Sequence, residues 1–214
     1  MPRHRQHVNP LKMSYFARSA ERLALPAGRE VEVELGCADA QFLFQRAAAD
    51  PGRVYVGLEI REDLAVEVAA RAHRMEAPIQ VVFCHANLDY AQLFAPRSVK
   101  RVFVNFPDPW FKRRHRKRRV VDAALAGDIA ASLVPGGELF FQSDVWDVAL
   151  DALAVLEAEP RLANEAGPWS FWKRGNPYGV KSRREEGCEE EGIPIWRLAF
   201  RKISGGPAPG SEAP

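Results

Sequence analysis

The chain has 214 residues, of which 47% are hydrophobic and 27% charged, a composition typical of one globular domain with a well-buried core. No apolar stretch reaches the roughly 18 residues that a membrane-spanning helix needs. The basic N-terminus is not followed by the apolar segment of a signal peptide. We therefore expect a cytoplasmic protein without a membrane anchor.

Positive charge is concentrated in one short tract. The whole chain carries 30 Lys and Arg against 28 Asp and Glu, but seven of the eight residues from 112 to 119 are Lys or Arg. The rest of the chain is therefore slightly acidic. Such a tract is the electrostatic footprint expected for a partner with a phosphate backbone. A solvated loop without any ligand is the alternative that charge alone leaves open.

The cysteines give no sign of a metal site. Cys37, Cys84 and Cys188 are odd in number and far apart, with no CxxC pair and no paired histidine spacing. This usage favours a reducing compartment and argues against zinc. We expect no metal.

The chain divides into three parts. Residues 1–29 form a basic arm with a predicted helix between Pro10 and Leu25, and the arm either touches nucleic acid or frays at the terminus. Residues 30–203 carry the globular domain. The tail, 204–214, has no sizeable apolar side chains to bury and is predicted to be disordered.

Strands and helices alternate through the domain. Strands are predicted at 31–35, 53–60, 79–86, 99–106, 137–144 and 193–202. Helices are predicted at 38–49 with Asp39 as N-cap, at 62–75, 89–94, 123–133 and 146–157. This order predicts an α/β fold with a doubly wound, parallel sheet and right-handed crossovers.

The stretch from 99 to 121 combines a buried strand with polar residues that suit a ligand site. The predicted strand ends at Pro107, and Asp108 lies between this proline and Pro109. Trp110 and Phe111 follow; stacking on a base is one role open to them, and we favour packing beneath the site for both. Because ligands of open α/β sheets bind at the carboxyl ends of the strands, we expect the site here.

The ends of the first two strands indicate an adenosine ligand without phosphates. The first strand ends in ELGCADA, which lacks the second and third glycines of a dinucleotide fingerprint. Glu59 ends the second strand, where an acid can accept both hydroxyls of a ribose, although it can also be an ordinary surface acid. Glu34 adds a second carboxylate. Two acids repel phosphates and suit the cationic S-adenosylmethionine.

The sequence resembles the bacterial tRNA (guanine-N7-)-methyltransferases, a class I methyltransferase family. NFPDPWFKRRHRKRR at 105–119 is similar to the family signature FPDPW-x-K-x-RH-x-KRR, and ELG, GLE and SD follow the family's order at 34–36, 57–59 and 143–144. Residues 182–185 resemble its T-[RK]-[FY]-E segment. The likeness spans 30–202. It implies a Rossmann-like fold with a mostly parallel sheet of about seven strands and helices on both faces.

The resemblance also implies an activity and a set of site residues. The activity is methyl transfer from S-adenosylmethionine to N7 of guanine 46 in the tRNA variable loop. The implied cofactor-binding residues are Glu34, Gly36, Glu59, Asn87 and Asp108, where Asn87 stands in for the family's Asp in a segment shifted by one residue. The implied substrate-binding residues are Lys112, Asp144, Ser182 and Glu185. We assign the remaining cations of the tract to tRNA phosphates: Arg113, Arg114, Arg116, Lys117, Arg118 and Arg119.

The residue types fit direct displacement. Guanine N7 carries an in-plane lone pair and no proton, so no general base is needed and alignment of the reactants is the main task. Asp108, the candidate catalytic residue, would stabilise the positive charge that develops on the base, and Lys112 would bond guanine O6. Asp108 as a turn acid, Lys112 as a phosphate contact and Asp144 as a helix N-cap are the structural alternatives.

Two other functions stay open on sequence alone. NFPDPW is also similar to the [ND]PP[YFW] motif of amino-methyltransferases, although the order Pro-Asp-Pro and the cationic tract argue against that reaction. The missing glycines would also fit a non-catalytic RNA-binding protein on the same scaffold. We expect a monomer, because no long apolar surface stripe is visible.

Overall fold

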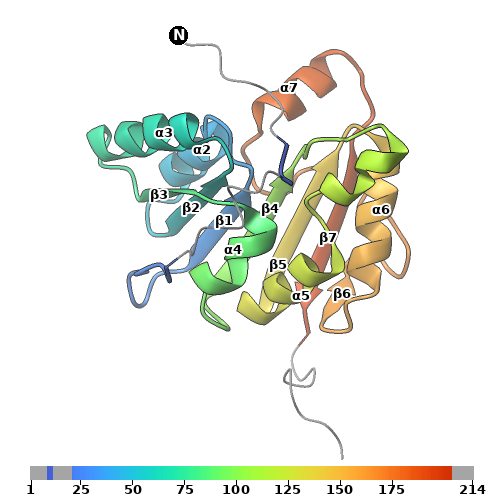
Figure 1. The fold of residues 1–214 in the computed structure, drawn as a ribbon, viewed down its shortest axis with the longest axis horizontal. Coiled ribbons are helices and arrows are strands. Elements are labelled where there is room, and N and C mark those ends of the chain that lie inside the picture. Colours follow the sequence, from blue (N-terminus) through green and yellow to red (C-terminus); the bar gives the residue numbers. More distant parts are fainter. Residues whose placement is uncertain (1–8, 12–20, 204–214) are drawn as a thin grey trace, which may run out of the picture.

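The computed structural model describes residues 9–11 and 21–203 (Figure 1). Most of the predicted basic arm and the predicted disordered tail, 204–214, lie outside this part of the chain. Of the predicted N-terminal helix only the ends are described, and residues 21–25 are not helical. Leu23 N donates to Leu93 O at 3.0 Å, at the end of the helix 86–93.

A single sheet of seven strands organises the described residues. Its strands are β1 (Val31–Leu35), β2 (Val54–Glu59), β3 (Ile79–Phe83), β4 (Val99–Asn105), β5 (Leu133–Ser143), β6 (Leu162–Asn164) and β7 (Trp196–Lys202). The spatial order is β3-β2-β1-β4-β5-β7-β6. The first five strands are parallel, and β7 pairs antiparallel with both β5 and β6. The predicted α/β, mostly parallel sheet is confirmed.

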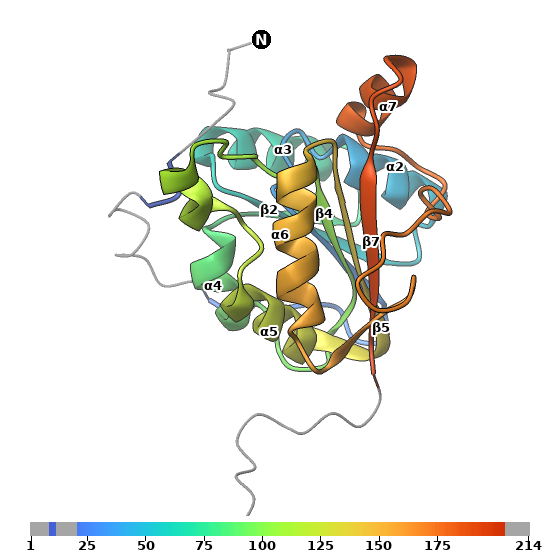
Figure 2. The same cartoon turned by 90° about the vertical axis from the view of Figure 1, so that its right-hand side faces the viewer.

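Helices cover both faces of the sheet. They are α2 (Gln41–Ala49), α3 (Glu62–Arg74), α4 (Ala86–Leu93), the short 3-10 helix η1 (Arg113–Arg118), α5 (Ala123–Ser132), α6 (Trp146–Glu157) and α7 (Arg183–Glu190). The first two pack into one core, and α4, α5 and α6 pack into the other. Figures 1 and 2 show this layering, with α7 beyond the end of β7.

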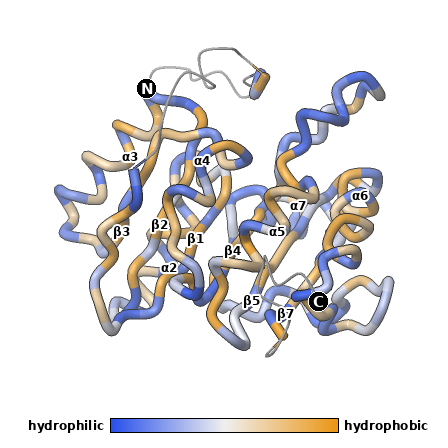
Figure 3. Tube along the Cα trace, turned by 60° about the horizontal axis from the view of Figure 1, so that its bottom comes forward, coloured by the Kyte–Doolittle hydropathy of each residue, from blue (hydrophilic) through white to orange (hydrophobic). Residues whose placement is uncertain are grey.

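The sheet separates the two cores, and successive side chains of its central strands point alternately into one core and the other. In β4, Val102 and Val104 belong to the core under α4, α5 and α6, whereas Phe103 belongs to the core under α2 and α3. Phe103 makes edge-to-face contacts with Phe42 and Tyr178, at centroid distances of 4.9 and 4.8 Å. Because both faces are buried, β2 and β4 contain continuous hydrophobic runs at 54–56 and 102–104 (Figure 3), whereas β1 alternates hydrophobic residues with buried glutamates.

The fifth strand is longer than the sequence predicts. It was expected to begin after the Pro-Gly-Gly turn, but β5 starts at Leu133 and passes through that segment. Leu133 pairs with Val99, and the register against β4 shifts before Arg101 pairs with Glu138. The irregularity accommodates the proline and glycines, so the pairing continues on both sides of them.

Other elements also differ from the sequence predictions. The helix expected at 89–94 begins earlier, at Ala86. The sequence predictions do not include η1, α7 or the three-residue edge strand β6. Asp39 was expected to cap α2, but the N-cap is Ala40 and no side chain caps the helix. Asp39 Oδ1 accepts a long hydrogen bond from Gln41 N at 3.4 Å, and the same carboxylate forms an ion pair with Arg183 at 2.8 Å.

The loop between β1 and α2 places two alanines in a conformation that favours glycine. Ala38 and Ala40 have φ values of 50° and 53°. The left-handed region costs a residue with a Cβ about 1–2 kcal/mol. Three backbone donors hold the loop in place: Gly36 N and Cys37 N bond to Leu58 O, and Ala38 N bonds to Glu59 Oε2.

We predict that Ala38→Gly stabilises the protein by up to about 1 kcal/mol, because the relieved strain exceeds the added freedom of the unfolded chain. The matched control is Ala48→Gly, at an exposed position of α2, which should cost about 0.5–1 kcal/mol. Urea unfolding measures both. Equal destabilisation by the two changes would show that the loop stores no strain.

Candidate active site

A cavity of about 780 Å³ opens at the carboxyl ends of β1, β2 and β4. The order of the strands reverses between β1 and β4, the place where open α/β sheets bind their ligands. Seven of the predicted site residues line the cavity: Glu34, Gly36, Glu59, Asn87, Asp108, Arg118 and Ser182. The volume lies within the range of small-molecule sites.

Glu34 is buried at the end of β1 and is only half satisfied. Its Oε1 accepts a hydrogen bond from Asn105 Nδ2 at 2.8 Å, whereas its Oε2 is buried without a hydrogen-bond partner among the described residues. Burial, opposed by the Asn105 hydrogen bond and reinforced by nearby Asp39 and Glu59, raises the pKa of Glu34 from 4.5 to about 8. The carboxyl group is therefore poised to ionise when a cation arrives.

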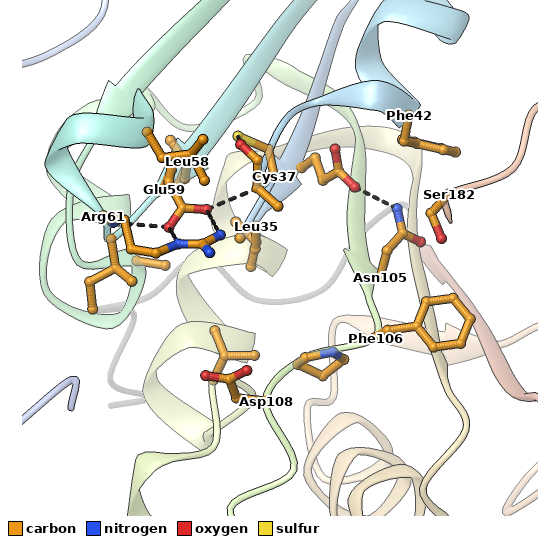
Figure 4. A pocket seen from close by; sticks show the side chains of 18 of the residues that line it. Leu35, Cys37, Phe42, Leu58, Glu59, Arg61, Asn105, Phe106, Asp108 and Ser182 are labelled. Atoms are coloured by element: carbon orange, nitrogen blue, oxygen red, sulfur yellow. Dashed lines mark hydrogen bonds and ion pairs between the residues drawn. The ribbon is translucent and has the colours of Figure 1, made fainter. Parts of the chain in front are cut away.

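Glu59 fastens the loop that follows β1. Its Oε2 accepts from Ala38 N at 2.9 Å, and its Oε1 accepts from Arg61 N at 2.9 Å and Arg61 Nε at 2.7 Å (Figure 4). The carboxylate is 2% exposed. A Cβ on Gly57 would lie 2.6 Å from Cys37 Sγ, so this glycine lets the loop approach β2. Any ribose bound here shares Glu59 with Arg61.

Asn87 lies in the first turn of α4 and ties this helix to the chain after η1. Its Nδ2 donates to Val120 O and to Asp122 Oδ2, both at 2.8 Å. Asp122 in turn caps α5 through a bond from Leu125 N at 2.9 Å. The amide nitrogen is therefore committed to the protein, and the carbonyl oxygen is the group suited to accept a bond from a ligand.

Asp108 lies in a turn after β4 in which two large residues have left-handed backbones. Phe106 and Trp110 have φ values of 48° and 45°. Asp108 lines the cavity across from Arg61 (Figure 4). The pKa of the Arg61 guanidinium is raised by its bond to Glu59 and, more weakly, by Asp108. Strain of this kind persists only where the surrounding structure enforces it, and it is frequent at functional sites.

The two aromatic residues after this turn lie in different environments. Trp110 lines the cavity, and the Arg118 guanidinium lies 4.9 Å from the centroid of its indole ring. Phe111 is 76% exposed, so the prediction that it packs beneath the site is wrong. Among the predicted phosphate contacts, Arg118 alone also lines the cavity.

The basic tract divides into exposed and buried members. Arg114, Arg116 and Lys117 are exposed on η1, whereas of Arg113 only the backbone is described. Arg119 is buried, and it donates to Pro109 O at 3.1 Å and to Asp147 O at 3.0 Å and pairs with Asp151. The assignment of Arg119 to tRNA phosphates is therefore wrong, because its side chain ties η1 to α6.

The predicted substrate residues do not all reach the cavity. Ser182 lines it and caps α7, where Ser182 Oγ accepts from Glu185 N at 3.3 Å. Glu185 has no exposed surface and is bonded inside the protein, so it is not a cavity residue. Lys112 is exposed outside the cavity. Asp144 also lies outside the cavity; it pairs with Arg184, and because α6 has no side-chain cap, it is not the N-cap.

Sequence reasoning missed Arg61, Asn105 and Gln142. Arg61 and Asn105 line the cavity, and Gln142, which has no exposed surface, is hydrogen-bonded to Asn105. Asn105 directly precedes the FPDPW motif, and Gln142 directly precedes the Ser-Asp pair. Polar side chains near the ends of otherwise apolar strands were the available signal.

The described part of the chain contains no cluster of three or more His, Cys, Asp or Glu side chains arranged to hold a metal ion. No helix in that part is long and apolar enough to cross a membrane. Its three cysteines are buried free thiols.

Solved structures with a similar fold include two methyltransferases. The antibiotic-resistance methyltransferase Kmr is 18% identical, with a TM-score of 0.59 over 84% of this chain and 90% of that protein. The 16S rRNA (adenine(1408)-N(1))-methyltransferase of Catenulisporales acidiphilia is 15% identical, with a TM-score of 0.56 over 82% and 85%. At these identities the likeness concerns the fold alone.

Comparisons of sequence go further. A family described as a putative methyltransferase matches residues 28–198. A tRNA (guanine-N(7)-)-methyltransferase of Synechococcus sp. (strain CC9311) is 38% identical over 92% of this chain and 87% of its own length. That of Trichormus variabilis is 35% identical over 94% and 96%. The chain therefore belongs to the tRNA (guanine-N(7)-)-methyltransferase family.

Proposed function

We propose that this protein transfers a methyl group from S-adenosylmethionine to N7 of guanine in tRNA, at position 46 of the variable loop. The observation that carries the proposal is the joining of two parts: a cavity at the reversal of the strand order, where Glu34 and Glu59 line the side formed by β1 and β2, and an exposed cationic surface on η1. The first suits a cationic adenosine compound, and the second suits a phosphate backbone.

The acidic side of the cavity fits S-adenosylmethionine. The buried Oε2 of Glu34 offers an acceptor for the amino group of the cofactor. Glu59 is suited to the ribose hydroxyls, Asn87 Oδ1 to the adenine amino group, and Gly36 to close approach by the ligand. When bound, S-adenosylmethionine supplies an electrophilic methyl group on a sulfonium.

Asp108 is the catalytic residue in this proposal. It would face the guanine and stabilise the positive charge that N7 acquires in the transition state. Ser182 would hold the guanosine from the other wall, and Lys112 and Asp144, at the rim, would complete the contacts. No side chain has to remove a proton, so the protein contributes mainly orientation and charge.

Exposed cations on η1 would position the tRNA. Arg114, Arg116 and Lys117 are exposed outside the cavity, which suits contacts with the phosphate backbone rather than with the reacting base. We include Arg113 in this set on sequence grounds, and Arg118 at the boundary between the backbone and the base. The protein would act as a monomer in the cytoplasm, where its free thiols stay reduced.

The two alternatives are not favoured. Asp108 stands between two prolines, whereas the amino-methyltransferase motif places its polar residue directly before a proline pair. The non-catalytic alternative rested on the missing glycines, yet Ala38 and Ala40 adopt the backbone that glycine would provide, beside an open cavity.

We predict that Asp108→Ala lowers kcat about 10²–10³-fold, because the developing charge on guanine loses its partner. Its affinity for tRNA should stay nearly unchanged. Methyl transfer to unmodified tRNA and filter binding measure the two quantities. Glu67→Ala, at an exposed position of α3, is the control of equal charge. Near-full activity of the Asp108 variant would refute the catalytic assignment.

We predict opposite effects of Glu34→Gln on stability and on cofactor binding. The folded protein keeps the Glu34 proton up to a pKa of about 8, whereas the unfolded chain releases it near 4.5. Wild-type stability therefore falls as the pH rises between these values, and the variant escapes this loss. Without cofactor, the variant should be a few kcal/mol more stable than the wild type at pH 8 and nearly equal at pH 4.5.

The same variant should bind S-adenosylmethionine at least about tenfold more weakly, because a buried cation loses its carboxylate. Urea unfolding at both pH values and titration calorimetry measure the two effects. Glu30→Gln, whose side chain is 47% exposed, is the control and should show neither effect. A variant that binds the cofactor normally would remove Glu34 from the site.

We predict that Arg116→Ala with Lys117→Ala weakens the binding of all tRNAs alike. The slope of log affinity against log salt should become shallower by about 1 to 2, since two phosphate contacts are lost. Arg71→Ala with Arg74→Ala removes the same charge from exposed positions on α3 and should leave the slope unchanged. Identical slopes for both double variants would show that η1 does not contact the backbone.

A further inference from the structure

An unbroken chain of hydrogen bonds runs from the cavity to α7. Asn105 Nδ2 donates to Glu34 Oε1 at 2.8 Å. Gln142 Nε2 donates to Asn105 Oδ1 at 3.0 Å and to Glu185 Oε2 at 2.9 Å. Asn105 and Gln142 are directly paired on neighbouring strands, so the chain crosses β1, β4 and β5 and then reaches α7.

The direction of every bond in this chain is fixed by Gln142. Its Nε2 uses both hydrogens, and its Oε1 accepts from Arg197 Nε at 3.1 Å. The amide therefore has only one orientation, which obliges Asn105 to accept with its oxygen and donate toward Glu34. Gln142 and Glu185 have no exposed surface. Bonds buried in this way are strong and depend on one another.

At the end farthest from Glu34, this chain of hydrogen bonds fixes the position of one wall of the cavity. Glu185 also accepts from Arg197 Nη2 and from Asn176 Nδ2, both at 2.8 Å. The first turn of α7 is thereby held through Glu185. The residues just before it line the same cavity as Glu34: Ser182, Arg183 and Arg184.

We propose that Asn105 and Gln142 are positioning residues that couple the cofactor end of the cavity to the tRNA-binding wall formed by 182–184. The inference rests on the proposed function, which assigns Glu34 to the cofactor and this wall to tRNA. A cation at Glu34 converts the Asn105 bond into a charge-assisted one, roughly twice as strong. The strengthened chain favours one arrangement of α7, the arrangement that the substrate requires.

The test is the affinity for tRNA, measured with and without saturating S-adenosylhomocysteine. In the wild type we expect binding to be tighter with this ligand by about fivefold or more. Gln142→Glu has the same shape but replaces two donors with acceptors, and its ratio of the two affinities should fall close to one. Gln92→Glu, exposed on α4, adds the same charge and should keep the wild-type ratio.

A second variant separates coupling from folding. Gln142→Glu with Glu185→Gln exchanges the amide and the carboxylate. The bond between these two side chains and the acceptors of Arg197 are restored, whereas the donor toward Asn105 is not, and Asn176 Nδ2 loses the oxygen that it bonds in the wild type. We expect its melting temperature to recover toward the wild-type value while the affinity ratio stays close to one. A merely structural role would restore both quantities together.

The outcomes distinguish a failure of the coupling from a failure of the proposed function. A wild-type ratio of one, or an undiminished ratio in either Gln142 variant, would overturn the coupling while leaving guanine methylation intact. A wild-type protein that binds S-adenosylhomocysteine and tRNA but forms no 7-methylguanosine would overturn the proposed function instead.

Discussion

The buried carboxyl group of Glu34 is the constraint around which the site is arranged. It lies at the end of β1, where the strand order reverses and backbone groups leave room for a ligand. A buried acid needs donors, and β4 supplies one through Asn105. The donor must itself be oriented, which brings in Gln142 from β5 and, beyond it, the carboxylate of Glu185. One oxygen, Oε2 of Glu34, is left buried without a hydrogen-bond partner among the described residues.

The wall of the cavity that contains Asp108 is shaped by backbone strain rather than by hydrogen bonds between side chains. Phe106 and Trp110 take left-handed conformations on either side of Pro107 and Pro109, and this turn brings Asp108 to the cavity. Arg119 then fastens the end of η1 to α6. The exposed cations of η1 consequently stand next to the cavity on a support that the fold itself holds in place.

Much of the fold follows from local sequence, and the exceptions have physical causes. The five parallel strands were predictable because β-branched and aromatic runs alternate with helical segments. Helix α7 was missed because its residues are almost entirely polar, although Ser182-x-x-Glu185 has the spacing of a capping box. The left-handed alanines depend on the docking of their loop against Leu58 and Glu59, which no local pattern encodes.

The acidic residues of the site could be predicted from the sequence, but the buried hydrogen bonds and ion pairs that hold the site in place could not. Glu34, Glu59 and Asp108 line the cavity, since strand ends are recognisable in sequence. The burial of Arg119 and Glu185 was not predictable, because an ion pair inside the protein and a contact with RNA require the same residue types. Only the packing of α6 and β7 against them distinguishes the two roles.

The most direct test of the account is the identity of the methylated atom. Unmodified tRNA would be incubated with the protein and labelled S-adenosylmethionine, digested to nucleosides, and the modified position mapped along the chain. We expect 7-methylguanosine at position 46 of the variable loop. A methyl group on an exocyclic amine, or tight tRNA binding without any transfer, would contradict it.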